Sequence, residues 1–197
     1  MDRAGLRRKL LKAQAEAGDF VLLFGDESEA LTHPYLAHAW AKRGADLRVP
    51  APGQAAKVAM LGVLDWARRD LLVQTSRTKR SADVIAFLAE IDRRWGPTPG
   101  GVVRPIVLVL DDGPIHTSKA ARAALAERAH WLTVEWLPKH APELNNIEPT
   151  WRDLKRHYLA HQTFTGPVDL DRAIHDAVTK PNAERNRDPL GSQRIAA

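Results

Sequence analysis

The chain has 197 residues, a formal net charge of +5 and a hydrophobic content of 44%. These values are typical of one globular domain that buries a core, and they argue against a disordered chain. The absence of cysteine excludes a disulfide framework, a thiolate metal site and a cysteine nucleophile. No apolar run could span a bilayer and no signal peptide opens the sequence, so we expect a cytoplasmic protein with no membrane partner.

The first half of the chain predicts one helix followed by three strands. Residues 3–17 show an amphipathic pattern, with Leu6, Leu10 and Leu11 on one side. The stretch FVLLFGDES then predicts a buried strand that ends at Asp26. The remaining elements of this half are a loop rich in Pro and Gly and the two strands of a hairpin, at residues 30–54, 55–66 and 70–77.

The second half of the chain predicts alternating helices and strands. Ser81 is the expected N-cap of the first helix, and the continuous apolar run PIVLVLDD predicts a strand that is covered on both faces. The expected elements are, in order, helix 81–95, strand 105–112, helix 116–130, strand 131–138, and helices 148–161 and 168–179. This order indicates an α/β protein with a mixed central sheet of about five strands and helices on both faces.

Carboxylates stand where the central strands are expected to end. The first and fourth predicted strands are the most apolar, so we expect them to be central neighbours, and they lead into Asp26 and Asp111. Ligands of open α/β sheets gather outside the carboxyl ends of such strands. A third carboxylate, Glu148, stands at the expected start of a helix, inside the unusual stretch LPKHAPELNNIEPTW.

Three carboxylates in one site repel one another, and each raises the pKa of the others. A divalent cation removes this conflict. Because the expected ligands are oxygens only, with no cysteine and no evident histidine pair, Mg²⁺ is the predicted ion and Mn²⁺ its substitute. Two such ions beside a phosphodiester stabilise the attacking and leaving oxygens of an in-line displacement. The carboxylates therefore favour phosphoryl transfer on nucleic acid.

Three stretches resemble, in order, the acidic motifs of the DDE transposases, specifically the mariner-like and related bacterial insertion-sequence families. They are FGDES, IVLVLDDGPIHTS and LPKHAPELNNIEPTW. The 36 residues between Asp111 and Glu148 match the spacing typical of that group. The resemblance implies a ribonuclease-H-like fold, and it assigns Asp26, Asp111 and Glu148 as the catalytic residues and metal ligands.

The resemblance also implies an activity and partners. The activity is metal-dependent DNA strand cleavage and strand transfer in DNA transposition, on double-stranded DNA that comprises transposon ends and target. The implied protein is bacterial and nucleoid-associated, and residues 1–18, 19–180 and 181–197 are expected to form a linker helix, the DDE catalytic domain and a flexible basic tail. The alternatives are a catalytically silent remnant that binds DNA or a partner transposase, and a stand-alone nuclease of the same fold.

The sequence departs from the family pattern at several points. Asp112 stands where the family usually has asparagine, Gly113 stands where alanine is common, and Asn146 replaces the proline of N-P-I-E. The family also carries an N-terminal helix-turn-helix, a module that reads the major groove, and this sequence begins after it. We therefore expect either half of a split or degraded element or a chain that works as a homodimer or with a separate helix-turn-helix chain.

Basic residues around the third motif are candidate contacts to DNA phosphates. The predicted DNA-binding residues are Lys139, Arg152, Lys155 and Arg156, of which the last three are expected on one helix face. A run of charges is also typical of a solvated helix face, and Arg152 with Arg156 forms a like-charge pair. Both interpretations stay open for these residues.

Other polar residues near the motifs have less specific expected roles. His116 follows Asp111 by five residues, and it is open whether this histidine caps a helix, contacts phosphate or takes part in catalysis. Asp112 and Glu27 are expected to be solvated neighbours rather than ligands. The remaining expectations concern the helix of Glu148, with Trp151 packed in the core and Asn145 or Asn146 as N-cap.

Overall fold

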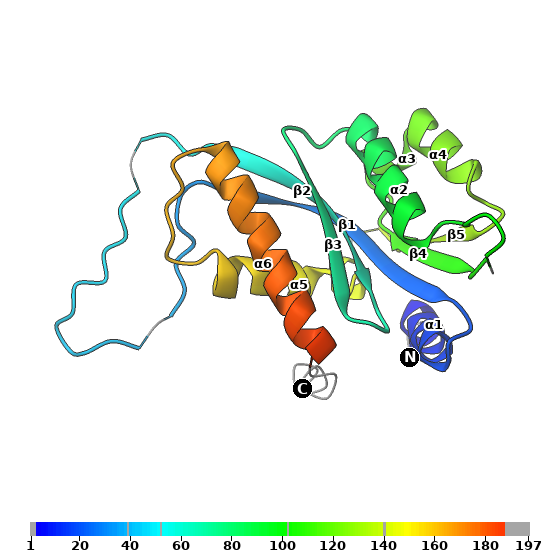
Figure 1. Ribbon diagram of the computed structural model, residues 1–197, viewed down its shortest axis with the longest axis horizontal. Helices are drawn as coiled ribbons and strands as arrows, with labels where there is room; N and C mark the ends of the chain where they lie inside the picture. Colours follow the sequence, from blue (N-terminus) through cyan, green and yellow to red (C-terminus); the bar gives the residue numbers. More distant parts are fainter. Residues whose placement is uncertain (1–2, 39, 52, 102, 140, 188–197) are drawn as a thin grey trace.

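The described part of the chain forms a mixed five-stranded sheet (Figure 1). The structure is a computed structural model and describes residues 3–38, 40–51, 53–101, 103–139 and 141–187. The strand order is β3-β2-β1-β4-β5, where β1 runs antiparallel to β2 and parallel to β4. The strands are β1 (Val21–Leu31), β2 (Lys57–Asp65), β3 (Asp70–Ser76), β4 (Ile106–Leu110) and β5 (Leu132–Trp136). The predicted mixed sheet, with the first and fourth strands as central neighbours, is confirmed.

Helices cover both faces of the sheet, as predicted. Side chains of α1, α5 and α6 join one hydrophobic cluster with one set of strand residues, and side chains of α2 and α4 join a second cluster with the alternate set. The helical elements are α1 (Arg3–Ala17), α2 (Ser81–Trp95), α3 (Pro114–Thr117), α4 (Lys119–Ala126), the 3₁₀ turn η1 (Pro142–Leu144), α5 (Glu148–Asp153), the π-helical turn η2 (Leu154–Tyr158) and α6 (Pro167–Arg187). None of the helices in the described ranges has the length and hydrophobicity needed to cross a bilayer.

The first strand is longer than the sequence predicted. Asp26 lies within β1 rather than at its end, because β2 continues to pair with β1 as far as Leu31. On its other side, β1 pairs with β4 only as far as Phe24, which lies opposite Val109. Asp26 therefore lies just beyond the point where the parallel neighbour ends, which is the edge at which ligands gather in such sheets.

The terminal helices also differ from the prediction. Leu11 is buried on α1 together with Ala15, but Leu6 and Leu10 are about half exposed, so these three leucines do not share a buried face. At the other end, α6 continues to Arg187. Residues 181–187 of the predicted flexible tail are therefore helical, and residues 188–197 lie outside the described residues. The division into linker helix, catalytic domain and tail stays a prediction.

Two helix starts differ from the prediction in detail. The cap position of α2 is Arg80, whose backbone N–H donates to Asp83, so Ser81 is already helical. The predicted helix 116–130 is divided at Ser118, whose side chain accepts a hydrogen bond from the N–H of Ala121 and caps α4. Local capping explains both differences, because each cap satisfies an N–H that the first helical turn leaves unpaired.

A close contact between a glycine and a tryptophan seats α5 on the sheet. Trp151 of α5 is buried, as predicted, and its ring lies against Gly62 of β2. A Cβ atom at Gly62 would lie 2.5 Å from Cη2 of Trp151. Gly62 is in turn the β2 partner of Asp26. The absence of a side chain at Gly62 thus lets the helix that begins with Glu148 approach the strand that carries Asp26.

We expect Gly62→Ala to lower the free energy of unfolding by about 1–3 kcal/mol, because an added methyl group overpacks the contact with Trp151. Urea denaturation measures the effect. Combining Gly62→Ala with Trp151→Phe should recover part of the loss, since phenylalanine lacks the ring atoms that the methyl group meets. Gly166→Ala is the control, because a Cβ there meets no atom within 4 Å. Unchanged stability of Gly62→Ala would contradict this packing.

Candidate active site

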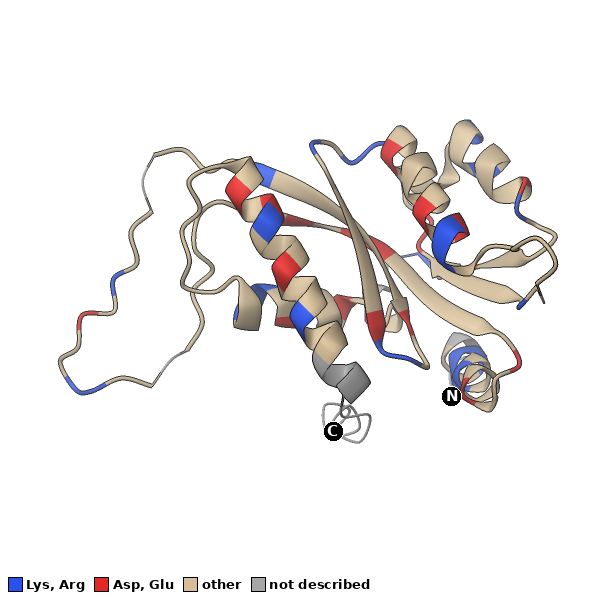
Figure 2. Ribbon diagram, viewed as in Figure 1, with Lys and Arg blue, Asp and Glu red and all other residues tan. Residues whose placement is uncertain are grey.

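The three carboxylates selected from the sequence line one cleft at the carboxyl end of β4. The cleft has a volume of about 390 Å³. Asp26 comes from β1, Asp111 directly follows β4, and Glu148 is the first residue of α5. The other lining residues are Asp112, Gly113, Pro114, Leu137, Pro138, Lys139, Ala141 and Asn145. Figure 2 marks the positions of the acidic residues of β1 and its surroundings in red on the ribbon.

The alternation of side chains along β1 determines which carboxylate reaches the cleft. Leu22 and Phe24 belong to the cluster under α5 and α6, whereas Leu23 belongs to the cluster under α2 and α4. By the two-residue period of a strand, Asp26 lies on the α5 side and Glu27 on the opposite side. Two consecutive acidic residues are therefore directed to different faces of the sheet.

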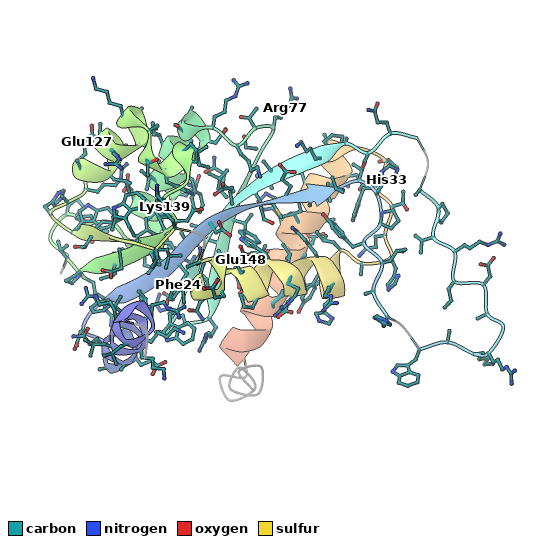
Figure 3. All side chains as sticks on the ribbon, turned by 180° about the vertical axis from the view of Figure 1, so that it is seen from behind. Phe24, His33, Arg77, Glu127, Lys139 and Glu148 are labelled. Atoms are coloured by element: carbon teal, nitrogen blue, oxygen red, sulfur yellow. The ribbon has the colours of Figure 1, made fainter. Side chains whose placement is uncertain are left out.

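The segment before Glu148 is anchored at two points. The side chain of Asn145 is buried, and its Nδ2 donates to the carbonyl oxygen of Gly25 over 2.9 Å. The Nη1 of Arg8 on α1 donates to the carbonyl oxygen of Leu144 over 2.5 Å. Figure 3 shows the result, with Glu148 at the start of α5 beside β1. The expectation that an asparagine caps α5 is wrong, because the cap position is Ile147 and Asn145 binds the strand instead.

The environment of Asp26 disfavours its ionised form. Burial raises the pKa of Asp26 to about 7, and the negative charges of Glu148, Glu27 and Asp111 act in the same direction. A proton or a cation would relieve this repulsion. The available donors at the cleft are carboxylate oxygens, which suit a hard divalent ion such as Mg²⁺ or Mn²⁺. The residues present therefore fit the predicted metal.

Sequence reasoning did not predict the contact between His116 and Glu27. The buried Nε2 of His116 lies 3.0 Å from Oε2 of Glu27 and 3.4 Å from Oδ1 of Asp111. Within the described residues, these three form a group whose potential ligand atoms lie within 4.8 Å of one another. The expectation of a solvated Glu27 is wrong, since only 21% of its side chain is exposed. The alternation in GDES was the available signal, because it directs Glu27 away from Asp26.

The other predicted neighbours of the site are more exposed. The side chain of Asp112 is 38% exposed, and its Oδ2 lies 3.9 Å from Nζ of Lys139. Lys139 is exposed at the mouth of the cleft, where Figure 3 labels it. This placement agrees with the expectation that Asp112 is a solvated neighbour.

The three basic residues that follow Glu148 do not share one solvated face. Arg152 and Arg156 are exposed, whereas Lys155 is partly buried and its Nζ donates to Oγ of Ser28 over 2.8 Å. Burial lowers the pKa of Lys155, while the nearby carboxylate of Glu148 acts in the opposite direction. The structure therefore separates Lys155 from the two exposed arginines, and contact of any of them with DNA stays a prediction.

In metal-free buffer we expect Asp26→Asn to stabilise the fold at about pH 8 by on the order of 1–3 kcal/mol, with little effect at about pH 4. The raised pKa means that the folded parent holds a proton that the unfolded chain releases, so its stability falls as pH rises from about 4 to about 7. Urea denaturation at both pH values measures the change, with Asp176→Asn on the exposed surface of α6 as control. An equal gain at both pH values would contradict the burial of this charge.

Comparison with known proteins places the chain in a family. The family is described as DDE superfamily endonuclease, and its match covers residues 21–170 of this chain. The chain is 25% identical over 162 residues to the insertion element IS630 uncharacterized 39 kDa protein of Shigella sonnei, and the match covers 82% of this chain and 43% of that protein. The chain thus spans less than half the length of this relative.

Solved structures with low sequence identity share the fold. The Mos1 transposase paired-end complex with the left transposon end has a TM-score of 0.56 at 17% identity, over 98% of this chain and 62% of that one. The HTLV-2 integrase catalytic core domain in complex with magnesium has a TM-score of 0.51 at 15% identity, over 80% of this chain and 81% of that one. The fold is therefore ribonuclease-H-like, and the chain belongs to the DDE superfamily endonucleases.

Proposed function

We propose that this chain is the catalytic domain of a transposase, which cleaves DNA strands and transfers them in a metal-dependent reaction. The observation that carries the proposal is the single cleft lined by Asp26, Asp111 and Glu148, from three separate elements. Membership of the DDE superfamily endonucleases supports a nuclease chemistry for this cleft. The Mos1 complex with its transposon end supports double-stranded DNA as the partner.

Asp26, Asp111 and Glu148 would hold Mg²⁺, with Mn²⁺ as a substitute. The HTLV-2 integrase core in complex with magnesium supports this choice of metal. When bound, the metal would stabilise negative charge on the attacking and leaving oxygens of the phosphodiester. Asp26 would release its proton as the site is loaded, because a carboxylate binds a metal in its ionised form. The fold contributes the fixed relative positions of the three carboxylates.

We expect Asp26→Asn, Asp111→Asn and Glu148→Gln each to abolish Mg²⁺-dependent nicking of supercoiled plasmid DNA. Each change removes a proposed metal ligand. The loss of activity should therefore exceed the roughly 10–100-fold loss that follows when an outer-shell partner of a metal is removed. Conversion of supercoiled to open-circular DNA measures the activity, with Mg²⁺ or Mn²⁺ and with a chelator.

Asp112→Asn is the matched control for Asp111→Asn, because it makes the same chemical change at the adjacent, more exposed position. Asp112→Asn should keep or raise activity, since it restores the residue usual in the family. Loss of nicking in this control would mean that the ligand in this motif is misassigned. A parent protein that binds DNA without nicking it under any of these conditions would favour the silent remnant.

Binding to DNA should be weak, insensitive to sequence and strongly dependent on salt, because phosphate contacts carry little sequence information and release counterions. Exposed cations near the cleft, Lys139, Arg152 and Arg156, are the proposed contacts. Arg152→Ala combined with Arg156→Ala should reduce the slope of log affinity against log salt by about 0.9 for each phosphate that the protein then fails to neutralise. Fluorescence anisotropy with several unrelated duplexes measures both properties.

Arg93→Ala combined with Arg94→Ala is the control for this experiment. It removes the same charge from α2, which covers the opposite face of the sheet from α5. This control should leave the salt dependence close to that of the parent. Equal effects of the two double variants would show that net charge, rather than a surface beside the cleft, determines binding. Tight, salt-resistant preference for one sequence would contradict the proposal that sequence reading requires a second module or chain.

A further inference from the structure

His116 occupies a position between two carboxylates that belong to different elements. Its side chain is 5% exposed and lies on α3, which begins shortly after Asp111. The Nε2 atom is 3.0 Å from Oε2 of Glu27 and 3.4 Å from Oδ1 of Asp111. Since both neighbours are hydrogen-bond acceptors, Nε2 must carry the hydrogen. The other ring nitrogen, Nδ1, makes no hydrogen bond within the described part of the chain.

Glu27 is the stronger partner of the ring and fixes its orientation. The side chain of His116 is 5% exposed and that of Glu27 is 21% exposed, so water has little access to the contact between them. The hydrogen bond from Nε2–H to Oε2 of Glu27, over 3.0 Å, is the geometric basis for this orientation. Because β1 directs Glu27 to the face opposite Asp26, Glu27 is absent from the lining of the cleft.

One hydrogen bond and one close polar contact meet at the same oxygen of Asp111. Oδ1 accepts a hydrogen bond from the N–H of Gly113 over 3.1 Å, and the Nε2 of His116, whose hydrogen bond goes to Glu27, lies 3.4 Å from it. Among the described residues, Oδ2 accepts no hydrogen bond. A Cβ at Gly113 would lie 3.1 Å from Oδ1, so the glycine leaves room for this carboxylate. The arrangement restricts rotation of the side chain that lines the cleft.

We propose that His116, oriented by Glu27, is a positioning residue that fixes the carboxylate of Asp111 for metal binding. Polar partners outside the coordination sphere orient ligands in this way and contribute to metal affinity. The inference rests on the proposed function, because it takes Asp111 as a metal ligand. It goes beyond the three carboxylates because it gives a shared role to Glu27, the second acidic residue of GDES, and His116.

The test compares two replacements of His116 that have similar length and volume. Glutamine can place an amide N–H near the position of Nε2, whereas methionine has no donor. We expect His116→Gln to bind Mn²⁺ within a few-fold of the parent and His116→Met to bind it roughly 10–100-fold more weakly. Isothermal titration calorimetry with Mn²⁺ in the absence of DNA measures this difference without relying on catalysis. His130→Gln, at an exposed position, is the control.

A second pair of variants keeps the test decisive if His116→Met does not fold. Glu27→Gln and Glu27→Met both remove the negative charge, but only glutamine can still accept a hydrogen bond from Nε2–H. We expect Glu27→Gln to bind Mn²⁺ more tightly than Glu27→Met. Thermal unfolding of all variants is also measured in metal-free buffer. If the residue contributed to packing alone, its replacement would lower stability, but the glutamine and methionine variants of each pair would bind Mn²⁺ with equal affinity.

The outcomes separate this inference from the proposed function. If the parent binds no Mn²⁺ and cuts no DNA, the proposed function fails and the positioning role fails with it. If the parent binds Mn²⁺ and the glutamine and methionine variants bind it equally in both pairs, the proposed function stands and the positioning role is overturned. A weaker methionine variant in either pair, with the glutamine variant close to the parent, supports the positioning role.

Discussion

The contact between Trp151 and Gly62 is the constraint on which the site depends. A helix as short as α5, with six residues, has little stability of its own in water, so its position must come from packing. The ring of Trp151 lies against the bare backbone of β2 at the residue that pairs with Asp26. Glu148 lies one helical turn before Trp151. The contact of Trp151 with Gly62 therefore fixes the position of the Glu148 carboxylate relative to the carboxylate of Asp26.

The approach of three carboxylates is unfavourable by itself, and the surrounding fold opposes their repulsion. Asn145 ties the segment before α5 to Gly25, and Arg8 ties it to the N-terminal helix. Burial raises the pKa of Asp26, and the charges of Glu148, Glu27 and Asp111 add to this effect. Binding of the proposed cation would stabilise the folded state, because a ligand that binds only the folded chain favours folding.

The alternation along β1 directs the two acidic residues of the motif to opposite faces of the sheet. Asp26 lines the cleft, and Glu27 lies behind it against His116, which in turn reaches Asp111. The proposed ligands are thus supported from the opposite face of the sheet. A strand in this position can supply both the functional side chain and the support for its neighbour, because adjacent residues necessarily lie on opposite faces.

The sequence by itself determined the α/β class, the neighbouring central strands and the three carboxylates of the cleft, because apolar runs and motif order are local properties of the chain. Only the tertiary structure decided that β1 continues past Asp26, because the length of β1 depends on its pairing with β2 rather than on its pairing with β4. The binding of Asn145 to β1 and the separation of Lys155 from Arg152 also depend on which surfaces meet. The same holds for Glu27 and His116, which are 89 positions apart in sequence and become partners only when α3 packs behind the sheet.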